Sequence, residues 1–300
     1  MSAEKVAAVI VHYRTPAETA AAAAAVASTA PDAEIVVVDN ASGDRVGEAL
    51  ARSAPGARLV AEDANRGYGA ACNRGARETS RSYLLFLNSD TVVGPGAVAA
   101  LAAALDADAG LAAVGPRLEN PDGSLQASIR LLPTPWRIFC ESSGLAFLSG
   151  GHAPFEGHTA TRQDHARARG VEALMGAALL VRRCAFEQVG GFDETFFLYA
   201  EETDLMERWR ERGWRLSYEP AARVAHAGGR SGGDRLFGQL HASLVRYERK
   251  HHGRGAALFA GVALDGGAAL RYAAALVTPG ERGRVRRARY RAALSRRRHP

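Results

Sequence analysis

Cysteine is scarce in this chain of 300 residues, which has three cysteines and no C-x-x-C pair. Cys72, Cys140 and Cys184 are too few and too scattered for a disulfide framework or a cysteine-rich zinc site, which favours a reducing compartment. Long uncharged apolar runs are missing too. The best candidate, residues 256–277, is interrupted by Asp265 and Arg271, so no run reaches the roughly 20 apolar residues that cross a bilayer. The first residues also lack the apolar segment of a signal peptide, and we therefore expect a cytoplasmic protein.

Acidic residues are almost absent from the last twenty positions, which hold nine Arg against Glu281 alone. The formal net charge of +6 therefore divides into +8 for residues 281–300 and −2 for residues 1–280. A nucleic-acid-binding body would need its basic residues clustered on a folded face. The partition predicts a near-neutral globular body with a basic tail and no nucleic-acid partner.

Short apolar segments alternate with helical patterns over the first part of the chain. Strands are expected at 6–12, 34–39, 57–61 and 83–87, with helices between them at 15–28, 44–53 and 67–80. Thr15, Pro16 and Glu18 have the pattern of a capping box at the start of the first helix. Strict alternation implies right-handed crossovers and a mostly parallel sheet with helices on both faces, so the predicted class is α/β.

The second half of the chain carries weaker patterns. They predict a helix from Pro95 to residue 105, strands at 112–116 and 172–182, a helix at 201–212, and short strands at 215–218 and 223–225. Residues 127–170 are expected to be an irregular excursion, and the chain to be helical from 235 onward with breaks near Gly253, Gly266 and Pro279. We expect an α/β domain over 1–232, a helical C-terminal extension over 233–280 and an Arg-rich tail over 281–300.

Ligands bind to such sheets beyond the carboxyl ends of the strands, which makes the residues there site candidates. Asp39 ends a predicted strand and could accept hydrogen bonds from a ribose or a base. The polar residues that follow it are equally typical of a turn, which Asp39 would then cap. Asn88 and Asp90 follow another strand. A carboxylate at Asp90 could hold a divalent cation that bridges a diphosphate, or could simply cap a turn.

A glycine-punctuated segment, NRGYGAACNRG from Asn65 to Gly75, enters a predicted helix. It lacks the G-x-G-x-x-G spacing of dinucleotide folds and the ending of a P-loop. Its glycines would allow a ligand to approach the backbone closely. Alternatively, Gly67 and Gly75 would only relieve helix–sheet packing.

Three acids, Glu201, Glu202 and Asp204, crowd together after an aromatic cluster at the start of a predicted helix. Acids in a first helical turn are favoured by the helix dipole. Burial beside aromatic rings could instead raise one carboxyl pKa and prepare a general base. His226, in a glycine-rich loop, is by itself more often structural than a ligand, and spacing alone does not pair it with Asp90.

Several sequence segments that occur in a fixed order point to a protein family more specifically than any single segment does. The chain resembles family 2 glycosyltransferases of the GT-A fold, whose sheet is Rossmann-like, and within them bacterial rhamnosyltransferases of cell-wall and O-antigen synthesis. The resemblance covers roughly residues 5–230. It is carried by the segments VVVDNASGD, NRGYGAACNRG, LLFLNSD, MGAALLVRR, GGFDETFFLYAEETDLMERWRERGW and VAH.

The resemblance implies roles for the candidate residues. Asp39 matches the acid that contacts the nucleobase, and Asn65, Gly67 and Asn73 match the loop that lines the nucleoside. Asn88 and Asp90 match the ends of the D-x-D-type motif on the donor diphosphate. Asp90 matches the residue that holds Mg²⁺ or Mn²⁺, and His226 matches a further ligand of the metal or the diphosphate in some members.

The resemblance also implies the general base. Residues 201–204 match the family's E-D-x-D motif, whose second residue removes the acceptor proton. That residue is Glu202 here, where the family usually has Asp. Glu201 and Asp204 therefore stay open as alternatives.

The implied reaction is an inverting transfer of L-rhamnose from dTDP-rhamnose to a hydroxyl of a glycan or polyprenyl-diphosphate-linked acceptor. A UDP-sugar-dependent transferase and a nucleotide-sugar-binding protein without transfer activity are the alternatives. Two apolar groups beside the Arg tail could be faces of interfacial helices that contact an anionic membrane. They are Leu258, Phe259 and Val262, and Leu270, Ala274 and Val277. We expect a peripheral location on the inner face of the plasma membrane; the alternative is packed helices with a disordered tail.

Overall fold

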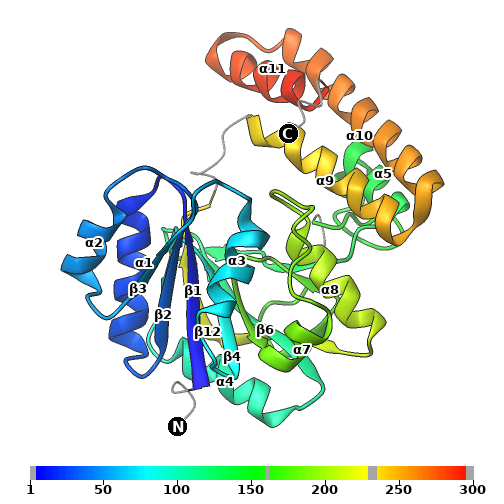
Figure 1. The fold of residues 1–300 in the computed structure, drawn as a ribbon. Coiled ribbons are helices and arrows are strands. Elements are labelled where there is room, and N and C mark those ends of the chain that lie inside the picture. The colour runs from blue at the N-terminus through cyan, green and yellow to red at the C-terminus, as the bar shows by residue number, and fades with distance from the viewer. Residues whose placement is uncertain (1–4, 160–161, 229–234, 295–300) are drawn as a thin grey trace. The chain divides into compact units, whose positions relative to one another are not determined.

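The computed structural model describes residues 5–159, 162–228 and 235–294, and these fall into two compact units. The first unit comprises Met1–Ile129, Asp164–Thr195 and Glu201–Gly228. The second comprises Arg130–Gln163, Phe196–Ala200 and Gly229–Pro300. Figure 1 shows a sheet flanked by helices in the first unit and a group of helices in the second. The sequence-based division at residues 232 and 280 stays a prediction.

One mixed sheet forms the centre of the first unit, with strand order β3-β2-β1-β4-β11-β6-β12-β5. β1 to β4 run parallel to one another, and β6 runs parallel to β12. β11 runs antiparallel to both β4 and β6, and β5 runs antiparallel to β12. The predicted, mostly parallel α/β sheet is confirmed. The strands are β1 (Val6–His12), β2 (Glu34–Asp39), β3 (Arg58–Ala61), β4 (Tyr83–Asn88), β5 (Thr91–Val93), β6 (Leu111–Glu119), β11 (Ala178–Arg182) and β12 (Arg215–His226), with β7 (Leu125–Gln126) beside β6 and β9 (Arg169–Val171) beside β12; β8 (Ile129–Arg130) pairs with β10 (Ala173–Leu174).

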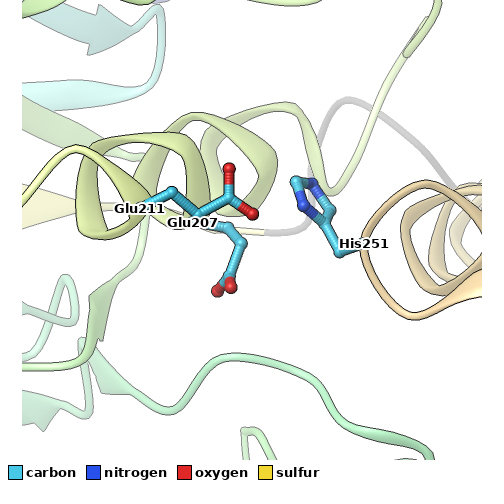
Figure 2. A group of neighbouring side chains, drawn as sticks. All are labelled: Glu207, Glu211 and His251. Carbon is cyan, nitrogen blue, oxygen red and sulfur yellow. The ribbon is translucent and has the colours of Figure 1, made fainter.

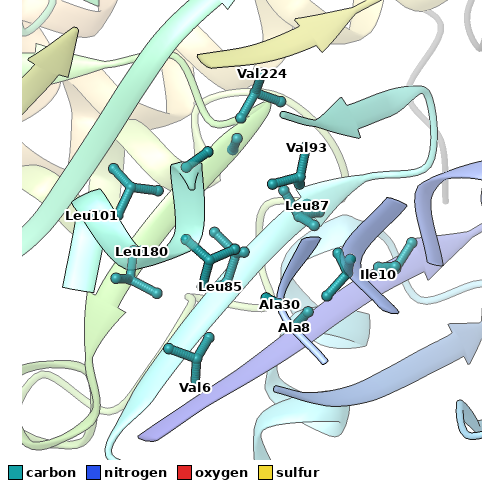
Figure 3. Close-up of a cluster of buried hydrophobic side chains, with 14 of the residues drawn as sticks. Val6, Ala8, Ile10, Ala30, Leu85, Leu87, Val93, Leu101, Leu180 and Val224 are labelled. Carbon is teal, nitrogen blue, oxygen red and sulfur yellow. The ribbon is translucent and has the colours of Figure 1, made fainter. Parts of the chain in front are cut away.

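Helices cover both faces of this sheet. On one face, alternate residues of β1 such as Val6, Ala8 and Ile10 join a buried cluster with side chains of α1, α2 and α4. Figure 3 shows these three residues together with Leu101 of α4. On the other face, a side chain at Gly75 of α3 would clash with Val9, so this glycine is required by helix–sheet packing. The helices of the unit are α1 (Pro16–Thr29), α2 (Val46–Ser53), α3 (Tyr68–Arg77), α4 (Ala97–Ala107), α7 (Arg183–Gln188) and α8 (Glu201–Glu211).

Three local predictions for the first unit are wrong. Thr15 is the N-cap residue of α1, but its side chain makes no capping hydrogen bond, and its hydroxyl donates to Ser89 Oγ at 2.9 Å. The strand predicted at 172–182 is interrupted at residues 175–177 and becomes β10 and β11. The strands predicted at 215–218 and 223–225 are one strand, β12, whose register shifts between Glu219 and Arg223.

The second unit consists of helices α5 (Pro135–Ser143), α6 (Leu145–Leu148), α9 (Arg235–His251), α10 (Gly253–Leu276) and α11 (Gly280–Leu294). The excursion expected at 127–170 therefore contains α5. The Thr134 side chain caps this helix by accepting a hydrogen bond from Arg137 N–H at 3.2 Å. The breaks near Gly253 and Pro279 are confirmed, but α10 continues through Gly266. The next residue, Gly267, allows α10 to lie against the Ser142 carbonyl of α5. The described part of the Arg-rich tail is helical rather than disordered.

A half-buried carboxylate on α5, Glu141, predicts acid sensitivity of the second unit. Glu141 lies 3.1 Å from His158 Nδ1 and accepts a hydrogen bond from Thr159 N–H at 3.0 Å. Burial alone would raise the pKa of Glu141, but His158 and Thr159 outweigh it and lower the pKa from 4.5 to about 2. A carboxyl group whose pKa falls on folding stabilises the folded state above its unfolded pKa, and this stabilisation is lost as the pH falls through its folded pKa.

We therefore expect the free energy of unfolding to fall between pH 4.5 and about 2 in the wild type. In Glu141→Gln it should be lower at neutral pH and less dependent on pH in this window. Urea unfolding followed by circular dichroism at a series of pH values measures this. Glu281→Gln, an exposed site on α11, is the matched control. Parallel pH curves for wild type and Glu141→Gln would contradict the expectation.

Candidate active site

The carboxyl ends of β1, β2 and β4 lie beside one another at one edge of the sheet. In the strand register, Asp39 of β2 is opposite His12 of β1, and Asn88 of β4 is opposite Val11. Two of the predicted site residues therefore flank the end of the same strand. This is the edge at which parallel α/β sheets bind ligands.

The turns that follow β1 and β2 are held to each other. Ser42 N–H donates to Asp39 Oδ1 at 2.9 Å, and Ser42 Oγ accepts Arg14 N–H at 3.0 Å. Asp39 thus caps a turn, as one interpretation of the sequence expected. Its second oxygen makes no hydrogen bond within the described residues. Arg14 and Ala41 have φ values of 57° and 58°, a left-handed conformation that is uncommon for non-glycine residues and is enriched at functional sites.

The sequence analysis did not single out Asn40, yet its side chain builds the neighbouring loop. The Asn40 amide donates to Asn65 Oδ1 at 2.9 Å and to the Gly67 carbonyl at 3.1 Å, and it accepts Arg66 N–H at 3.2 Å. Asn65 Oδ1 also accepts Gly67 N–H at 3.0 Å. Gly67 has φ +95°, which explains why glycine is needed before α3. Asn40 therefore brings the predicted nucleoside loop to the end of β2.

Asn73 connects α3 to a more distant segment of the same unit. Its amide N–H groups donate to the Phe192 carbonyl and to Glu194 Oε1, both at 2.9 Å, and its oxygen accepts Phe192 N–H at 2.9 Å. Asn73 therefore positions the segment that precedes the acidic cluster. Its direct contact with a nucleoside stays a prediction.

The three acids at the start of α8 have three different environments. Asp204 is fully buried and pairs with Arg208, with 2.8 Å between Oδ2 and Nε. Glu201 is 4% exposed, and burial, together with the nearby charge of Glu202, raises its pKa well above the usual value. Glu202 is only half-buried. The position most accessible to a substrate is therefore Glu202.

A glycine brings Glu202 to the edge of the sheet. A Cβ atom placed on Gly176 would lie 3.0 Å from Glu202 Cγ, so the Glu202 side chain lies directly against this backbone. The adjacent Ala177 carbonyl accepts Asn88 N–H at 2.9 Å. The acidic cluster and the Asn88–Asp90 segment, which are more than a hundred residues apart in sequence, thus both lie against the backbone of residues 176–177.

Asp90 and His226 also come together, which the sequence alone did not establish. His226 Nε2 lies 3.4 Å from Asp90 Oδ1, and the pair is held by a main-chain hydrogen bond from Ala227 N–H to the Asp90 carbonyl at 3.0 Å. Burial alone would raise the pKa of Asp90, but His226 and backbone N–H groups outweigh it and lower the pKa.

A second residue that the sequence analysis missed, Gln126 of β7, orients this histidine. Its side-chain oxygen contacts His226 Nδ1 at 2.7 Å, while its amide nitrogen donates to Asn120 Oδ1 at 3.1 Å. Since the oxygen of Gln126 can only accept, Nδ1 of His226 carries the proton. In the neutral imidazole, Nε2 then presents a lone pair to the Asp90 carboxylate. Two hydrogen-bond acceptors at this separation need a proton or a cation between them. As metal ligands, an oxygen and a nitrogen atom suit Mn²⁺ or Mg²⁺.

A further group of acidic and histidine side chains is drawn in Figure 2. Glu207 and Glu211 are one turn apart on α8 and extend from the same side of the helix, and Glu207 also pairs with Arg210. His251 ends α9. Because the two carboxylates belong to the first unit and the histidine to the second, we assign no metal site to them.

The fold, together with the residues at the carboxyl edge of its sheet, indicates a class of protein. A doubly covered, mostly parallel sheet with acids gathered at the strand ends is the architecture of GT-A glycosyltransferases. The model of glycosyl transferase family 2 matches residues 8–189, and the chain belongs to this family. It is a glycosyltransferase, as the sequence predicted.

Relatives support the same assignment. An N-acetylglucosaminyl-diphospho-decaprenol L-rhamnosyltransferase of Mycobacterium tuberculosis is 33% identical over 237 residues, which cover 73% of this chain and 76% of the relative. The mannosyltransferase PcManGT from Pyrobaculum calidifontis, solved with GDP-Man and Mn²⁺, has a TM-score of 0.61 and 16% identity over 97% of this chain and 85% of its own. GalNAc-T7, solved with UDP, GalNAc and Mn²⁺, has a TM-score of 0.55 and 14% identity over 96% and 54%. The two structures show the GT-A fold.

Proposed function

We propose that the protein transfers L-rhamnose from dTDP-rhamnose to a hydroxyl of a glycan linked to a polyprenyl diphosphate, with inversion at the anomeric carbon. The 33% identical mycobacterial relative, named for L-rhamnosyl transfer to a diphospho-decaprenol acceptor, supports the choice of substrates. The observation that carries the proposal is the position of Glu202. It is a partly exposed carboxylate packed on Gly176, beside the Asn88 end of the sheet.

The donor would bind along the turns after β2 and β3. The Asp39 oxygen that makes no hydrogen bond within the described residues is the acceptor for the nucleobase. The loop from Asn65 to Gly67, fixed by Asn40, would line the nucleoside. Asn73 would hold the segment at Phe192 in place, and Asn88 and Asp90 would face the diphosphate.

Glu202 would act as the general base. Its carboxylate removes the proton from the acceptor hydroxyl while that oxygen forms a bond to the anomeric carbon and the bond to the nucleoside diphosphate breaks. One displacement inverts the configuration and needs no covalent intermediate on the enzyme. Glu201 is too buried to meet an acceptor, and Asp204 is already paired with Arg208.

Asp90 and His226 would hold the cation, Mg²⁺ or Mn²⁺, through Oδ1 and Nε2. Both solved neighbours named above contain Mn²⁺. A bound cation neutralises charge on the departing diphosphate. The proton on His226 Nδ1, fixed by Gln126, leaves Nε2 available for this purpose.

Gln126 supplies a testable prediction about this site. Gln126→Leu removes the acceptor for Nδ1 and should weaken Mn²⁺ binding about 10–100-fold, the usual effect of losing a partner that orients a metal-binding histidine. Gln126→Glu keeps an acceptor at the same place and should restore most of the affinity. Electron paramagnetic resonance of free Mn²⁺ measures the affinity, and ¹⁵N shifts of the His226 ring report its tautomer without metal. Unchanged Mn²⁺ binding and an unchanged tautomer in Gln126→Leu would contradict the assignment.

A donor screen tests the proposed function as a whole. Thermal shifts are compared for dTDP-rhamnose, UDP-GlcNAc, UDP-galactofuranose and GDP-mannose, with and without Mg²⁺ or Mn²⁺, because a ligand stabilises the state that binds it. We expect the largest shift with dTDP-rhamnose and metal. Mass spectrometry should then show rhamnose on a polyprenyl-diphosphate-linked N-acetylglucosamine acceptor. Turnover of a UDP-sugar would favour that alternative, and donor binding without nucleotide release would favour a binding protein.

The proposed acceptor places the enzyme at a membrane. None of the helices in the described residues is long and apolar enough to cross one. Because the proposed acceptor is lipid-linked, we propose a peripheral position on the inner face of the plasma membrane, with anionic lipid as the contacting surface.

A further inference from the structure

Helix α10 of the second unit has two opposite faces. Its buried residues, among them Ala260, Leu264 and Ala268, pack toward α5 and α9. Because successive helical residues are about 100° apart, these buried residues fall in one sector of about 120°. The large exposed side chains fall in the opposite sector. They are Leu258, Phe259, Val262, Leu270 and Leu276, which are 71, 46, 65, 68 and 58% exposed.

The exposed sector carries no charge. The helix has only three charged residues, Arg254, Asp265 and Arg271. Arg271 donates to the Glu141 and Ser142 carbonyls of α5, so it lies on the packed side, and the helical positions of Arg254 and Asp265 place them on the flank. A helix of 24 residues extends about 36 Å, so this is a long outward apolar face. Contiguous exposed apolar surface of this kind marks a contact with a protein or a membrane.

A groove of about 600 Å³ opens between α9 and α10 beside this face. Val245, Leu258 and Val262 contribute apolar walls, and Arg249 and Arg254 line the same groove. Both arginines are exposed and form no ion pair within the described residues. The groove thus combines walls that accept a hydrocarbon chain with two guanidinium groups that accept a phosphate.

We propose that the outward face of α10 and this groove dock on a bilayer containing anionic phospholipid. Leu258, Val262 and Leu270 enter the acyl-chain boundary, and Arg249 and Arg254 contact lipid phosphates. The inference deepens the proposed function, since it identifies the surface that would bring the enzyme to a lipid-linked acceptor. An amphipathic helix with an uncharged face and flanking arginines lies in the plane of the interface.

Charge favours a bilayer over a second copy of the chain. In a symmetric dimer the same patch would face itself, which brings Arg249 and Arg254 of both copies together with only Asp265 on the same flank of α10 to offset them. Exposed arginines of α11, at 282, 284 and 286, add to the positive charge of this unit. An anionic surface compensates the charges of Arg249 and Arg254, which line one groove.

Vesicle sedimentation with the full chain tests the proposal, without donor or acceptor. Wild type should bind vesicles of phosphatidylcholine mixed with phosphatidylglycerol. It should bind only weakly to vesicles made of phosphatidylcholine without an anionic lipid. Arg249→Gln with Arg254→Gln should weaken binding about thirtyfold, since each arginine near the surface contributes a factor of about five. Leu258→Glu with Val262→Glu should weaken it at least about tenfold. Two matched control variants in the first unit should bind as wild type does. One carries Leu59→Glu, and the other carries both Arg52→Gln and Arg212→Gln.

A second measurement reports insertion. Brominated lipids should quench the fluorescence of a tryptophan introduced by Val262→Trp, but not of one introduced by Leu59→Trp. Equal binding by wild type and the α10 variants, equal loss in the controls, or a concentration-dependent dimer that Val262→Glu dissociates would overturn the proposal. Vesicle binding without rhamnose transfer would reject only the proposed function. Transfer to a soluble acceptor without vesicle binding would reject only the docking surface.

Discussion

Glu202→Gln is expected to lower turnover about 10²–10⁴-fold, the range that general-base assistance contributes. The amide keeps the size of the side chain and its packing on Gly176, but it cannot take the acceptor proton. Binding of dTDP-rhamnose should survive, because Asp39 and the loop fixed by Asn40 lie at the ends of other strands. Steady-state rates of dTDP release with acceptor, together with the thermal shift produced by donor alone, measure the two effects separately.

The neighbouring acids make this prediction specific. Asp204→Asn removes a fully buried partner of Arg208 and should therefore lower the free energy of unfolding more than it lowers turnover per folded molecule. Glu211→Gln, an exposed site on the same helix, is the control for the glutamate-to-glutamine change. Near-normal turnover in Glu202→Gln with a folded but inactive Asp204→Asn would move the base to Asp204.

Local patterns predicted most of the sheet and its helices. The strand at residues 6–12 is β1 as expected, because a short run of Val, Ile and Ala is typical of a strand that is buried on both faces. Predictions failed where a distant residue competes with the local pattern. Thr15 has the sequence of a helix cap, but Ser89 engages its hydroxyl. Glycine at 266 suggests a helix end, yet small residues there let α10 lie closely on α5.

The candidate site shows the same limit. Asp39 and Asn88 could be placed at one edge because carboxyl ends of parallel strands gather there. Asn40 and Gln126 could not, since their importance depends on hydrogen bonds to residues 25 and 100 positions away. The signal for Asn40 was nevertheless present, since it is a polar residue directly after an apolar strand segment, at the edge where such sheets bind ligands. Nothing local distinguishes Gln126, because β7 is only two residues long.

Asp90→Asn is expected to remove the metal dependence of transfer and to lower turnover about 10³-fold, because stabilisation of the leaving charge by a cation is worth several kcal/mol. The fold around it should persist. The Asp90 carbonyl, which accepts Ala227 N–H at 3.0 Å, is untouched by the substitution. Loss of the carboxylate also leaves His226 Nε2 without its charged neighbour, so Mn²⁺ affinity measured by electron paramagnetic resonance should fall together with turnover.

The wild type and Asp90→Asn are therefore best compared across a titration of chelator and of Mn²⁺. Turnover of the wild type should fall to the level of Asp90→Asn in excess chelator and recover when Mn²⁺ is restored, whereas the variant should respond to neither. Asp32→Asn, an exposed site before β2, should behave as the wild type does. Full wild-type activity in chelator would instead mean that the proton between Asp90 and His226, and not a cation, satisfies these two acceptors, and that leaving-group charge is neutralised elsewhere in the site.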